Sequence, residues 1–481
     1  MAWLLLVLCV LGFGFQGTRA LWSTDEGRYT ENALQMIDSG NYLVPAYNQD
    51  RVNFTKPPVT YWLIAGSMRL FGRTTWAARL PYALAFIFTA LLLCGMGRWL
   101  LSGRLWLPGL IYGCSLVPFL MANVVSTDGL LVAFEALATY GFLAASFGPA
   151  RKAGRYLVLM WLGFGLAFLT KGPPGLMPLL GMLPFVYRKQ RWPGVRALFA
   201  PLGLVVFLLV GLGWYALVVV RQPALVHYFL HYEIYNRIFT PTQNRHPQWY
   251  GWFVVYAPVL VLGSLPWWRP LARVVRQAAS VRNWRDGWAQ QPPRLFLWLW
   301  FLLALTVFCL ARSRLPAYVL PLFIPLSLLV AMELEATFDM RSTRRRVLLG
   351  LWMVALLVLK GGIGHFYHPH VDNRVRARSL GQKVAASRYA AVTFIEATDD
   401  HVAIEEHTPW GMRLYLRKPV YAIAWNKPGA AQRLCRLVDV HSPLLVAADA
   451  SLELRANCPG TALTVVGDWR GRHLLLISAG K

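Results

Sequence analysis

Residues 77–97 read AARLPYALAFIFTALLLCGMG, and this stretch decides the fold class of the chain. After Arg79 it contains no charged side chain, and an α-helix needs roughly 20 apolar residues to cross a bilayer. Similar runs recur from Leu4 to Gly362. The 481 residues are 56% hydrophobic and 15% charged, whereas soluble domains are about 25% charged. This composition excludes a soluble enzyme, a coiled coil and a disordered chain, and it predicts a polytopic α-helical membrane protein.

The apolar runs predict about eleven membrane spans, with an upper bound of thirteen. They lie near residues 2–18, 77–97, 105–121, 128–147, 156–170, 174–187, 197–220, 250–268, 295–311, 315–333 and 347–363. With the N-terminus in the cytoplasm, 19 of the 48 Lys and Arg residues fall in loops on that side, as the positive-inside rule requires. The net charge of +26 therefore indicates topology rather than nucleic-acid binding. The first span could instead be a cleaved signal peptide, but it lacks a basic start, which favours a retained helix.

Residues 364–481 follow the last span, and we expect them on the outer side of the membrane. Their short apolar runs are typical of strands and alternate with polar stretches that suit helices, which predicts a small α/β domain. The chain is accordingly divided into a transmembrane domain, residues 1–363, with an outer loop at 19–76, and this outer domain. Cys435 and Cys458 are its two cysteines, and they are a candidate disulfide if the compartment oxidises thiols.

The loop between the first two spans carries a charged, helix-forming motif. Ser23 followed by Glu26 matches a capping box, which predicts that a helix begins there. Four side chains share one face of such a helix by their spacing, namely Asp25, Arg28, Tyr29 and Asn32. A carboxylate, a guanidinium and a phenol would then project at a helix start, where backbone amides favour anions. The alternative is an ordinary capped surface helix with an intrahelical ion pair.

Three further places put charged side chains at the outer ends of spans. Lys56 directly precedes two prolines that favour the start of a second, interfacial helix, and its ammonium suits a phosphate or an anionic headgroup. Asp128 lies at the outer start of the fourth span, where an ordinary N-cap is the alternative. Arg312 and Arg314 lie in a tight outer loop, where basic residues are disfavoured and need an anionic partner such as a lipid phosphate.

These loops supply carboxylates and cations at one membrane face. Such a set can hold a lipid-linked phosphate while a carboxylate activates a nucleophile. The sequence contains no P-loop, dinucleotide fingerprint, Cys/His zinc spacing or nucleophile elbow. It therefore favours transfer chemistry on a lipid-linked substrate.

Several motifs, in order along the chain, resemble those of one family. They are Asp25-Glu26-Gly27-Arg28-Tyr29, Lys56-Pro57-Pro58 with Tyr61-Trp62, Ala78-Arg79-Leu80-Pro81, Thr170-Lys171-Gly172-Pro173 and Arg314 to Pro321. By these motifs the chain resembles the bacterial branch of the protein mannosyltransferase-like GT-C glycosyltransferases, typified by the aminoarabinose transferase that modifies lipid A. The resemblance implies a multi-pass enzyme of the bacterial inner membrane with its active site and C-terminal domain in the periplasm. Its reaction would move a sugar, with inversion, from a polyprenyl-phosphate donor to an envelope acceptor such as lipid A.

The resemblance also implies roles for individual residues. Asp25 matches the family's catalytic aspartate, Glu26 is the second acid of the same motif, and Asp128 resembles a further acid near the site. The candidates for binding the donor and its polyprenyl phosphate are Arg28, Tyr29, Lys56, Arg312, Arg314 and Tyr318.

The chain departs from the family at the positions that bind a metal in the relatives. The lipid A transferases commonly have Glu immediately before the lysine of Lys-Pro-Pro, and a Glu-His pair after the seventh span. This chain has Thr55 at the first position and Glu233-Ile234 at the second. We therefore expect no metal cofactor, with cationic side chains neutralising the phosphate. His227 and His231 are the alternative ligands.

Two other functions remain open at the level of sequence. One is a protein O-glycosyltransferase of the same fold, whose acceptor is a Ser or Thr hydroxyl. The other is a non-catalytic polyprenyl-phosphate carrier or flippase, which would need no paired acids and would favour charged helices at mid-membrane depth.

Overall fold

The chain forms two compact units in a computed structural model. This structure describes residues 1–49, 51–236, 245–280, 292–339, 341–364, 371–452 and 458–479. One part, here called the helical unit, comprises residues 1–16, 55–60 and 79–361. The other, the sheet unit, comprises residues 17–54, 61–78 and 362–481. Most of the first predicted outer loop thus packs with the C-terminal residues, while the predicted domain boundary at residue 363 stays a prediction.

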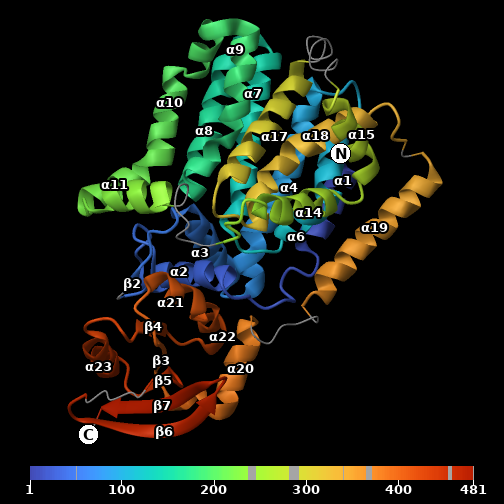
Figure 1. The fold of residues 1–481 in the computed structure, drawn as a ribbon. Coiled ribbons are helices and arrows are strands. Elements are labelled where there is room, and N and C mark those ends of the chain that lie inside the picture. Colours follow the sequence, from blue (N-terminus) through green and yellow to red (C-terminus); the bar gives the residue numbers. More distant parts are fainter. Residues whose placement is uncertain are drawn as a thin grey trace. The chain divides into compact units, whose positions relative to one another are not determined.

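The helical unit consists of long helices and short helical turns (Figure 1). Its α-helices are α1 (Ala2–Phe13), α4 (Thr75–Met96), α5 (Leu107–Cys114), α6 (Leu116–Met121), α7 (Thr127–Phe147), α8 (Ala153–Lys171), α9 (Met177–Leu198), α10 (Pro201–Phe207), α11 (Gly213–Arg221), α12 (Leu225–His227), α14 (Gly251–Gly263), α15 (Trp268–Ala278), α17 (Pro292–Leu310), α18 (Phe323–Leu334) and α19 (Thr343–Gly362). Its 3-10 and π turns are η1 (Gly97–Trp99), η2 (Ala150–Lys152), η3 (Pro173–Leu176), η4 (Leu208–Leu212), η5 (Tyr228–Asn236) and η7 (Pro316–Leu322). Every predicted span coincides with at least one of these elements.

Six helical stretches in the described part of the chain are long and apolar enough to cross a membrane. They are residues 75–99, 127–147, 150–171, 201–221, 292–310 and 316–334. The third predicted span is instead two short helices, α5 and α6, because Ser115 between them has an extended backbone. The protein is therefore a polytopic helical membrane protein, as the sequence predicts, and the number of spans stays a prediction.

Two glycines bring α7 and α8 into close contact. A Cβ atom on Gly141 of α7, or on Gly163 of α8, would lie 2.6 Å or 2.5 Å from a backbone nitrogen of the facing helix. Real Cβ atoms do not approach backbone this closely, so both positions require glycine. The close packing of these two helices brings Asp128, at the start of α7, to Lys171, at the end of α8.

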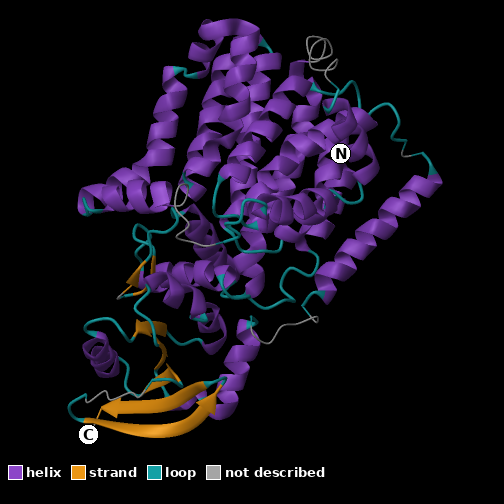
Figure 2. Ribbon diagram, viewed as in Figure 1, coloured by secondary structure: helices purple, strands orange, loops and turns teal. Residues whose placement is uncertain are grey.

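The C-terminal residues form a five-stranded mixed sheet with helices, which confirms the predicted α/β domain (Figure 2). The strands are β3 (Ala391–Glu396), β4 (Val420–Ala424), β5 (Leu444–Asp449), β6 (Thr461–Trp469) and β7 (Arg472–Ala479), in the order β4-β3-β5-β7-β6. The pairs β4-β3 and β3-β5 are parallel, and β5-β7 and β7-β6 are antiparallel. The helical elements are α20 (Asn373–Lys383), η8 (Ala386–Arg388), α21 (His401–His407), η9 (Trp410–Met412), α22 (Arg413–Leu416) and α23 (Ala430–Val440). Strand β3 is buried along its whole length, as expected of a central parallel strand covered on both faces.

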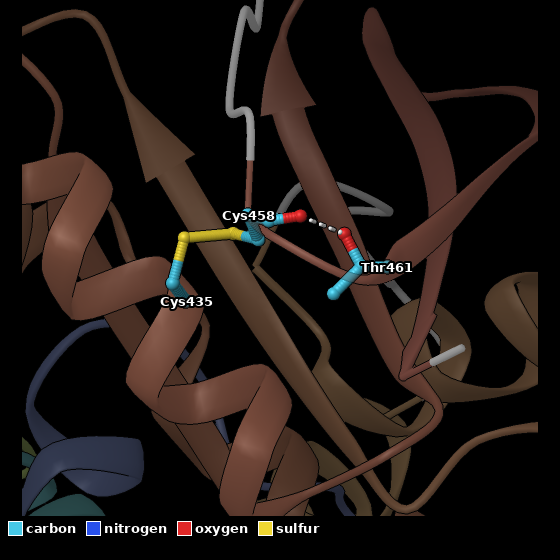
Figure 3. The surroundings of a disulfide bond; sticks show 3 residues. All are labelled: Cys435, Cys458 and Thr461. Carbon is cyan, nitrogen blue, oxygen red and sulfur yellow. Dashed lines mark hydrogen bonds between the residues drawn. A yellow bond between two sulfur atoms is a disulfide. The ribbon is translucent and has the colours of Figure 1, made fainter. Parts of the chain in front are cut away.

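Cys435 and Cys458 form the expected disulfide, with their Cα atoms 5.3 Å apart (Figure 3). Cys435 lies on α23, and Cys458 lies in the segment before β6. Thr461, at the start of β6, donates a hydrogen bond from its hydroxyl to the Cys458 carbonyl at 2.8 Å. The disulfide thus links α23 to the segment before β6, at the antiparallel edge of the sheet.

Removal of this disulfide in the double variant C435S/C458S is expected to lower the free energy of unfolding. The cross-link joins positions 23 residues apart, and closing a loop of that size stabilises by about 3 kcal/mol. Denaturant unfolding of the purified protein measures this change. Cys9→Ser, at a free cysteine, is the control and should leave stability near that of the unaltered chain. An unchanged transition midpoint in the double variant would contradict the prediction.

The first outer loop contains two helices, as predicted, but its capping differs. Its elements are α2 (Asp25–Ser39), β1 (Ala46–Asn48), β2 (Arg51–Val52) and α3 (Val59–Phe71). The N-cap of α2 is Thr24, with no side-chain cap, so the predicted capping box of Ser23 and Glu26 is wrong. Glu26 accepts a hydrogen bond from the Trp22 backbone at 2.9 Å, and the Ser23 hydroxyl donates to Asn373 at 3.2 Å. Tertiary contacts therefore replace the local cap.

Candidate active site

Asp25 and Arg28 form an ion pair in the first turn of α2. Arg28 Nη2 donates to Asp25 Oδ1 at 2.5 Å, which confirms that these side chains share a helix face. The Asp25 side chain is 48% exposed, whereas that of Arg28 is 17% exposed. Arg28 Nε is buried and has no hydrogen-bond partner among the described residues. An accessible carboxylate is thus oriented by a guanidinium that keeps a free donor.

Buried amide and phenol groups support this turn of α2. The Asn32 side chain donates to the Arg28 carbonyl oxygen at 2.9 Å. Asn53 Nδ2 donates to the Asn32 side chain and to the Tyr61 hydroxyl, each at 3.2 Å. The buried ring of Tyr29 lies 5.9 Å from that of Tyr61, between ring centroids. Tyr29, a predicted substrate contact, is therefore buried in the sheet unit.

Glu26 is buried in a second ion pair. Arg19 donates two hydrogen bonds to its carboxylate, at 2.7 Å and 2.8 Å, and both side chains are at most 5% exposed. With the Trp22 backbone as a third donor, the carboxylate has no open side for a substrate. We infer that Glu26 holds the segment before α2 in place, so the geometry does not support the catalytic role expected for it.

Arg413 connects α2 to the C-terminal part of the sheet unit. Its guanidinium donates to Glu31 at 2.5 Å, to Gln35 at 3.0 Å and to Asp38 at 2.5 Å. Glu31 is fully buried, and this burial raises the pKa of its carboxyl to about 7 although Arg413 opposes the shift. Arg413 thus anchors α2, the helix that carries Asp25, and its partner Glu31 has a pKa of about 7.

The titration of Glu31 is expected to lower the free energy of unfolding of the protein as the pH rises from about 4.5 to above 7. In that range Glu31 ionises in the unfolded chain, where its ordinary pKa is 4.5, before it ionises in the folded protein. The raised pKa therefore stabilises the fold at low pH, by about 3 kcal/mol relative to alkaline pH. Thermal unfolding between pH 4.5 and 8.5 measures the effect. Glu31→Gln, which mimics the protonated group, should lose this part of the pH dependence, and an unaltered pH profile in that variant would refute the prediction.

In the helical unit, Asp128 and Lys171 form a buried ion pair. Ser126 is the N-cap of α7 and accepts a hydrogen bond from the Asp128 backbone at 3.3 Å. The Asp128 side chain instead accepts from Lys171 Nζ, with both side chains at most 10% exposed. Lys171 Nζ also lies 4.4 Å from the ring centroid of Tyr318. Lys171 is not among the predicted site residues, and its position before Gly-Pro-Pro at the outer end of a span was the available signal.

The two arginines between α17 and η7 differ in their surroundings. Arg314 is buried and donates to the carbonyl oxygens of His246, Gln248 and Cys309, at 2.7 Å, 2.8 Å and 2.9 Å. These bonds occupy the two terminal nitrogens, while Nε is buried without a hydrogen-bond partner among the described residues. We infer that Arg314 chiefly holds the loop together. Arg312 is exposed and has no hydrogen bond or ion pair among the described residues. It is the arginine of this loop that remains accessible to an anion.

Lys56 lies in the turn that leads into α3, as predicted from the two prolines after it. Helix α3 begins at Val59, and the Lys56 side chain is partly exposed. Lys56 therefore lies three residues before a helix begins, with a partly exposed side chain.

The positions of the family's metal ligands do not assemble a donor set in the described part of the chain. Among those residues, no three His, Cys, Asp or Glu side chains are grouped to hold a metal ion. His227 and His231 stack with their ring centroids 5.0 Å apart, and Glu233 accepts a hydrogen bond from a tyrosine. Thr55 offers a hydroxyl rather than a carboxylate, and the side chain of Ile234 lies outside the described residues. Among the described residues, these positions do not fit a metal site.

Comparison with known proteins finds a family model and several transferases that are similar to this chain. Residues 55–215 match the family described as dolichyl-phosphate-mannose-protein mannosyltransferase. An undecaprenyl phosphate-alpha-4-amino-4-deoxy-L-arabinose arabinosyl transferase from Enterobacter sp. (strain 638) is 33% identical over 324 residues, covering 65% of this chain and 55% of the relative. A second enzyme of that name, from Sodalis glossinidius, is 33% identical over 376 residues, covering 76% and 66%. The chain thus matches between 55% and 66% of the length of these relatives.

Two kinds of solved structure share the fold. ArnT from Cupriavidus metallidurans, in a crystal structure with bound undecaprenyl phosphate, superposes with a TM-score of 0.76 at 19% identity, covering 100% of this chain and 99% of that one. The archaeal oligosaccharyltransferase AglB from Archaeoglobus fulgidus, in complex with an inhibitory peptide and a dolichol-phosphate, gives a TM-score of 0.54 at 13% identity, covering 93% and 69%. At these identities the likenesses show the fold alone, and the first of them extends over the whole chain.

Proposed function

Because the chain belongs to the bacterial protein mannosyltransferase-like GT-C glycosyltransferases, the family of the aminoarabinose transferases, we propose that it transfers a sugar from a polyprenyl-phosphate donor to lipid A or another envelope acceptor. The observation that carries the proposal is the half-exposed Asp25 carboxylate, held by Arg28 at the start of α2. A carrier protein has no need of such a group, whereas a transferase uses it to act on the nucleophile.

The proposed reaction is a single displacement at the anomeric carbon. An oxygen of the acceptor attacks this carbon from the face opposite the donor phosphate, the bond from carbon to phosphate oxygen breaks, and the configuration inverts. Asp25 accepts the proton when the acceptor is a hydroxyl, and it orients the acceptor when that is a phosphate. Asp128 is the second candidate for the base, although its ion pair with Lys171 makes it less available.

The leaving polyprenyl phosphate gains negative charge during this step, and cations stabilise it. We propose this role for Arg28, Lys56 and Arg312, which were expected from the sequence, and for Lys171. Tyr318 orients Lys171 through its ring, and Arg314 shapes the loop that carries Arg312.

The proposed location is the bacterial inner membrane, with eleven spans and the site and the C-terminal domain in the periplasm. The disulfide in the C-terminal domain supports this orientation, since disulfides persist in the periplasm and are rare in the cytosol.

Activity is expected to be independent of added divalent metal. Thr55 and the stacked His227–His231 pair do not offer a carboxylate-rich donor set, so the cations would neutralise the phosphate instead. Dialysis against a chelator should change kcat/KM by less than about twofold, since each cationic contact stays in place. Stoichiometric zinc or manganese in the purified protein, with activity lost on chelation and restored by metal, would overturn this expectation.

Mass spectrometry of lipid A and of other envelope glycans, from cells with the gene intact or deleted, tests the function. Loss of a sugar-sized mass from lipid A on deletion is the expected result. Unchanged lipid A with a glycan lost from a protein would keep the transferase and change its acceptor. No product lost in any fraction would favour the carrier function.

A further inference from the structure

Glu135 is a buried carboxyl group inside α7 that no part of the proposed reaction uses. Its side chain is 0% exposed, and neither of its oxygens has a hydrogen-bond partner among the described residues. It follows Asp128 by seven residues, which is about two helical turns, so both lie on one face of α7 about 10 Å apart along the axis. An ionisable group at this depth in a membrane helix is costly and is a marker of function.

The charged groups around Glu135 are few. Lys171 and Asp128 are the residues that interact with it electrostatically. Among the described residues, other titratable side chains on α7 and on elements near it include Tyr140 on α7, Tyr156 on α8, Tyr318 on η7, Tyr82 on α4 and Arg98 on η1, while η3 carries none. The basic residues of α9 lie at the opposite end of α7, where Lys189 covers Phe147.

This arrangement places two acids and one base in an apolar bundle. Asp128 and Lys171 neutralise each other, so an ionised Glu135 would add one uncompensated negative charge at a cost of several kcal/mol. A bound proton removes that charge. Glu135 is therefore neutral while Lys171 pairs with Asp128.

Ionisation of Glu135 would weaken the attraction between the Lys171 ammonium group and an anion. A second carboxylate on the same face of α7 attracts the ammonium group away from an incoming phosphate, and it also repels that phosphate directly. Protonated Glu135 does neither. Its protonation state thus controls how strongly the helical unit attracts an anion at Lys171.

We propose that Glu135 is a positioning residue, which through its bound proton keeps Lys171 available to the phosphate of the lipid-linked donor; this rests on the proposed function. The residue contacts no substrate and takes part in no bond exchange. It acts through Lys171, so its effect is on the binding of the lipid phosphate.

The experiment measures binding of undecaprenyl phosphate to the full-length protein in lipid nanodiscs, between pH 6 and pH 9. The quantity compared is the dissociation constant of the unaltered protein divided by that of Glu135→Gln. This ratio should be near 1 while Glu135 carries its proton and rise toward about 10, as expected for one added charge near the ligand, when rising pH removes that proton. Dividing the two constants at each pH cancels the titration of the phosphate itself and of the other side chains.

Thr139→Val is the matched control. Thr139 lies one turn beyond Glu135, is equally buried, and its hydroxyl likewise has no partner in the described part of the chain. The dissociation constant of the unaltered protein divided by that of Thr139→Val should not change with pH. Glu135→Met, a second neutral variant, should behave like Glu135→Gln.

A ratio that stays constant with pH in both neutral variants overturns the inference and leaves the proposed function intact. Misfolding of both neutral variants also overturns it, because glutamine closely replaces a carboxyl that carries a proton. If the unaltered protein binds no polyprenyl phosphate at any pH, the proposed function fails and the inference fails with it.

Discussion

Asp25→Asn is expected to lower kcat/KM for sugar transfer by about 1000-fold while leaving the protein folded. The amide preserves the shape of the side chain but neither accepts a proton nor carries the charge that pairs with Arg28. General base catalysis by a positioned carboxylate contributes about 10²–10⁴ to the rate. The half-exposed ion pair adds little to stability, so the melting temperature should stay near its original value. Initial rates with purified protein, polyprenyl-phosphate sugar and acceptor measure the effect.

Asp38→Asn is the matched control, because Asp38 lies on the same helix and also pairs with an arginine, Arg413. It should weaken the fold and leave kcat unchanged. If Asp25→Asn keeps near-original turnover, or if both variants lose turnover equally, Asp25 has no special catalytic role.

Lys171→Met is expected to lower kcat/KM by about 100-fold, which is the typical cost of removing one preorganised contact to a developing charge. It should also lower the free energy of unfolding by about 3–5 kcal/mol, because the buried Asp128 loses its partner. Turnover assays and denaturant unfolding measure the two effects separately.

The double variant D128N/K171M separates stability from function. It removes both charges of the pair, so most of the lost stability should return. Activity should not return, because the ammonium group is still missing. Recovery of activity together with stability would show that Lys171 is only structural.

The sequence predicts the membrane-spanning helices, the α/β domain and the Cys435–Cys458 pair because these depend on local patterns. Apolar runs, alternating strands and the count of cysteines in one compartment are properties of short segments. The structure confirms a polytopic helical membrane protein, the C-terminal sheet and the disulfide, while the number of spans stays a prediction.

The structure gives several charged residues partners that the sequence does not predict. Ser23 and Glu26 fit a local capping box, yet Glu26 pairs with Arg19 in the structure. Arg314 fits a phosphate-binding motif by sequence, and in the structure its two terminal nitrogens donate to three backbone carbonyls. From the sequence, Lys171 resembles an ordinary residue at the end of a helix. Only the packing of α8 against α7 shows that it pairs with Asp128.

The sequence alone therefore determines where this chain forms helices, strands and a membrane domain, and it identifies Asp25 and Arg28 as neighbours on one helix turn. Only the tertiary structure decides which charges are buried, which are satisfied and which stay open. The sequence shows which side chains share a helix face because these are residues three or four positions apart. The free energy of a charged group depends instead on burial and on partners brought from distant parts of the chain, such as Arg413 for Glu31. Glu135 is the clearest case, since only packing shows that its carboxyl has no partner among the described residues.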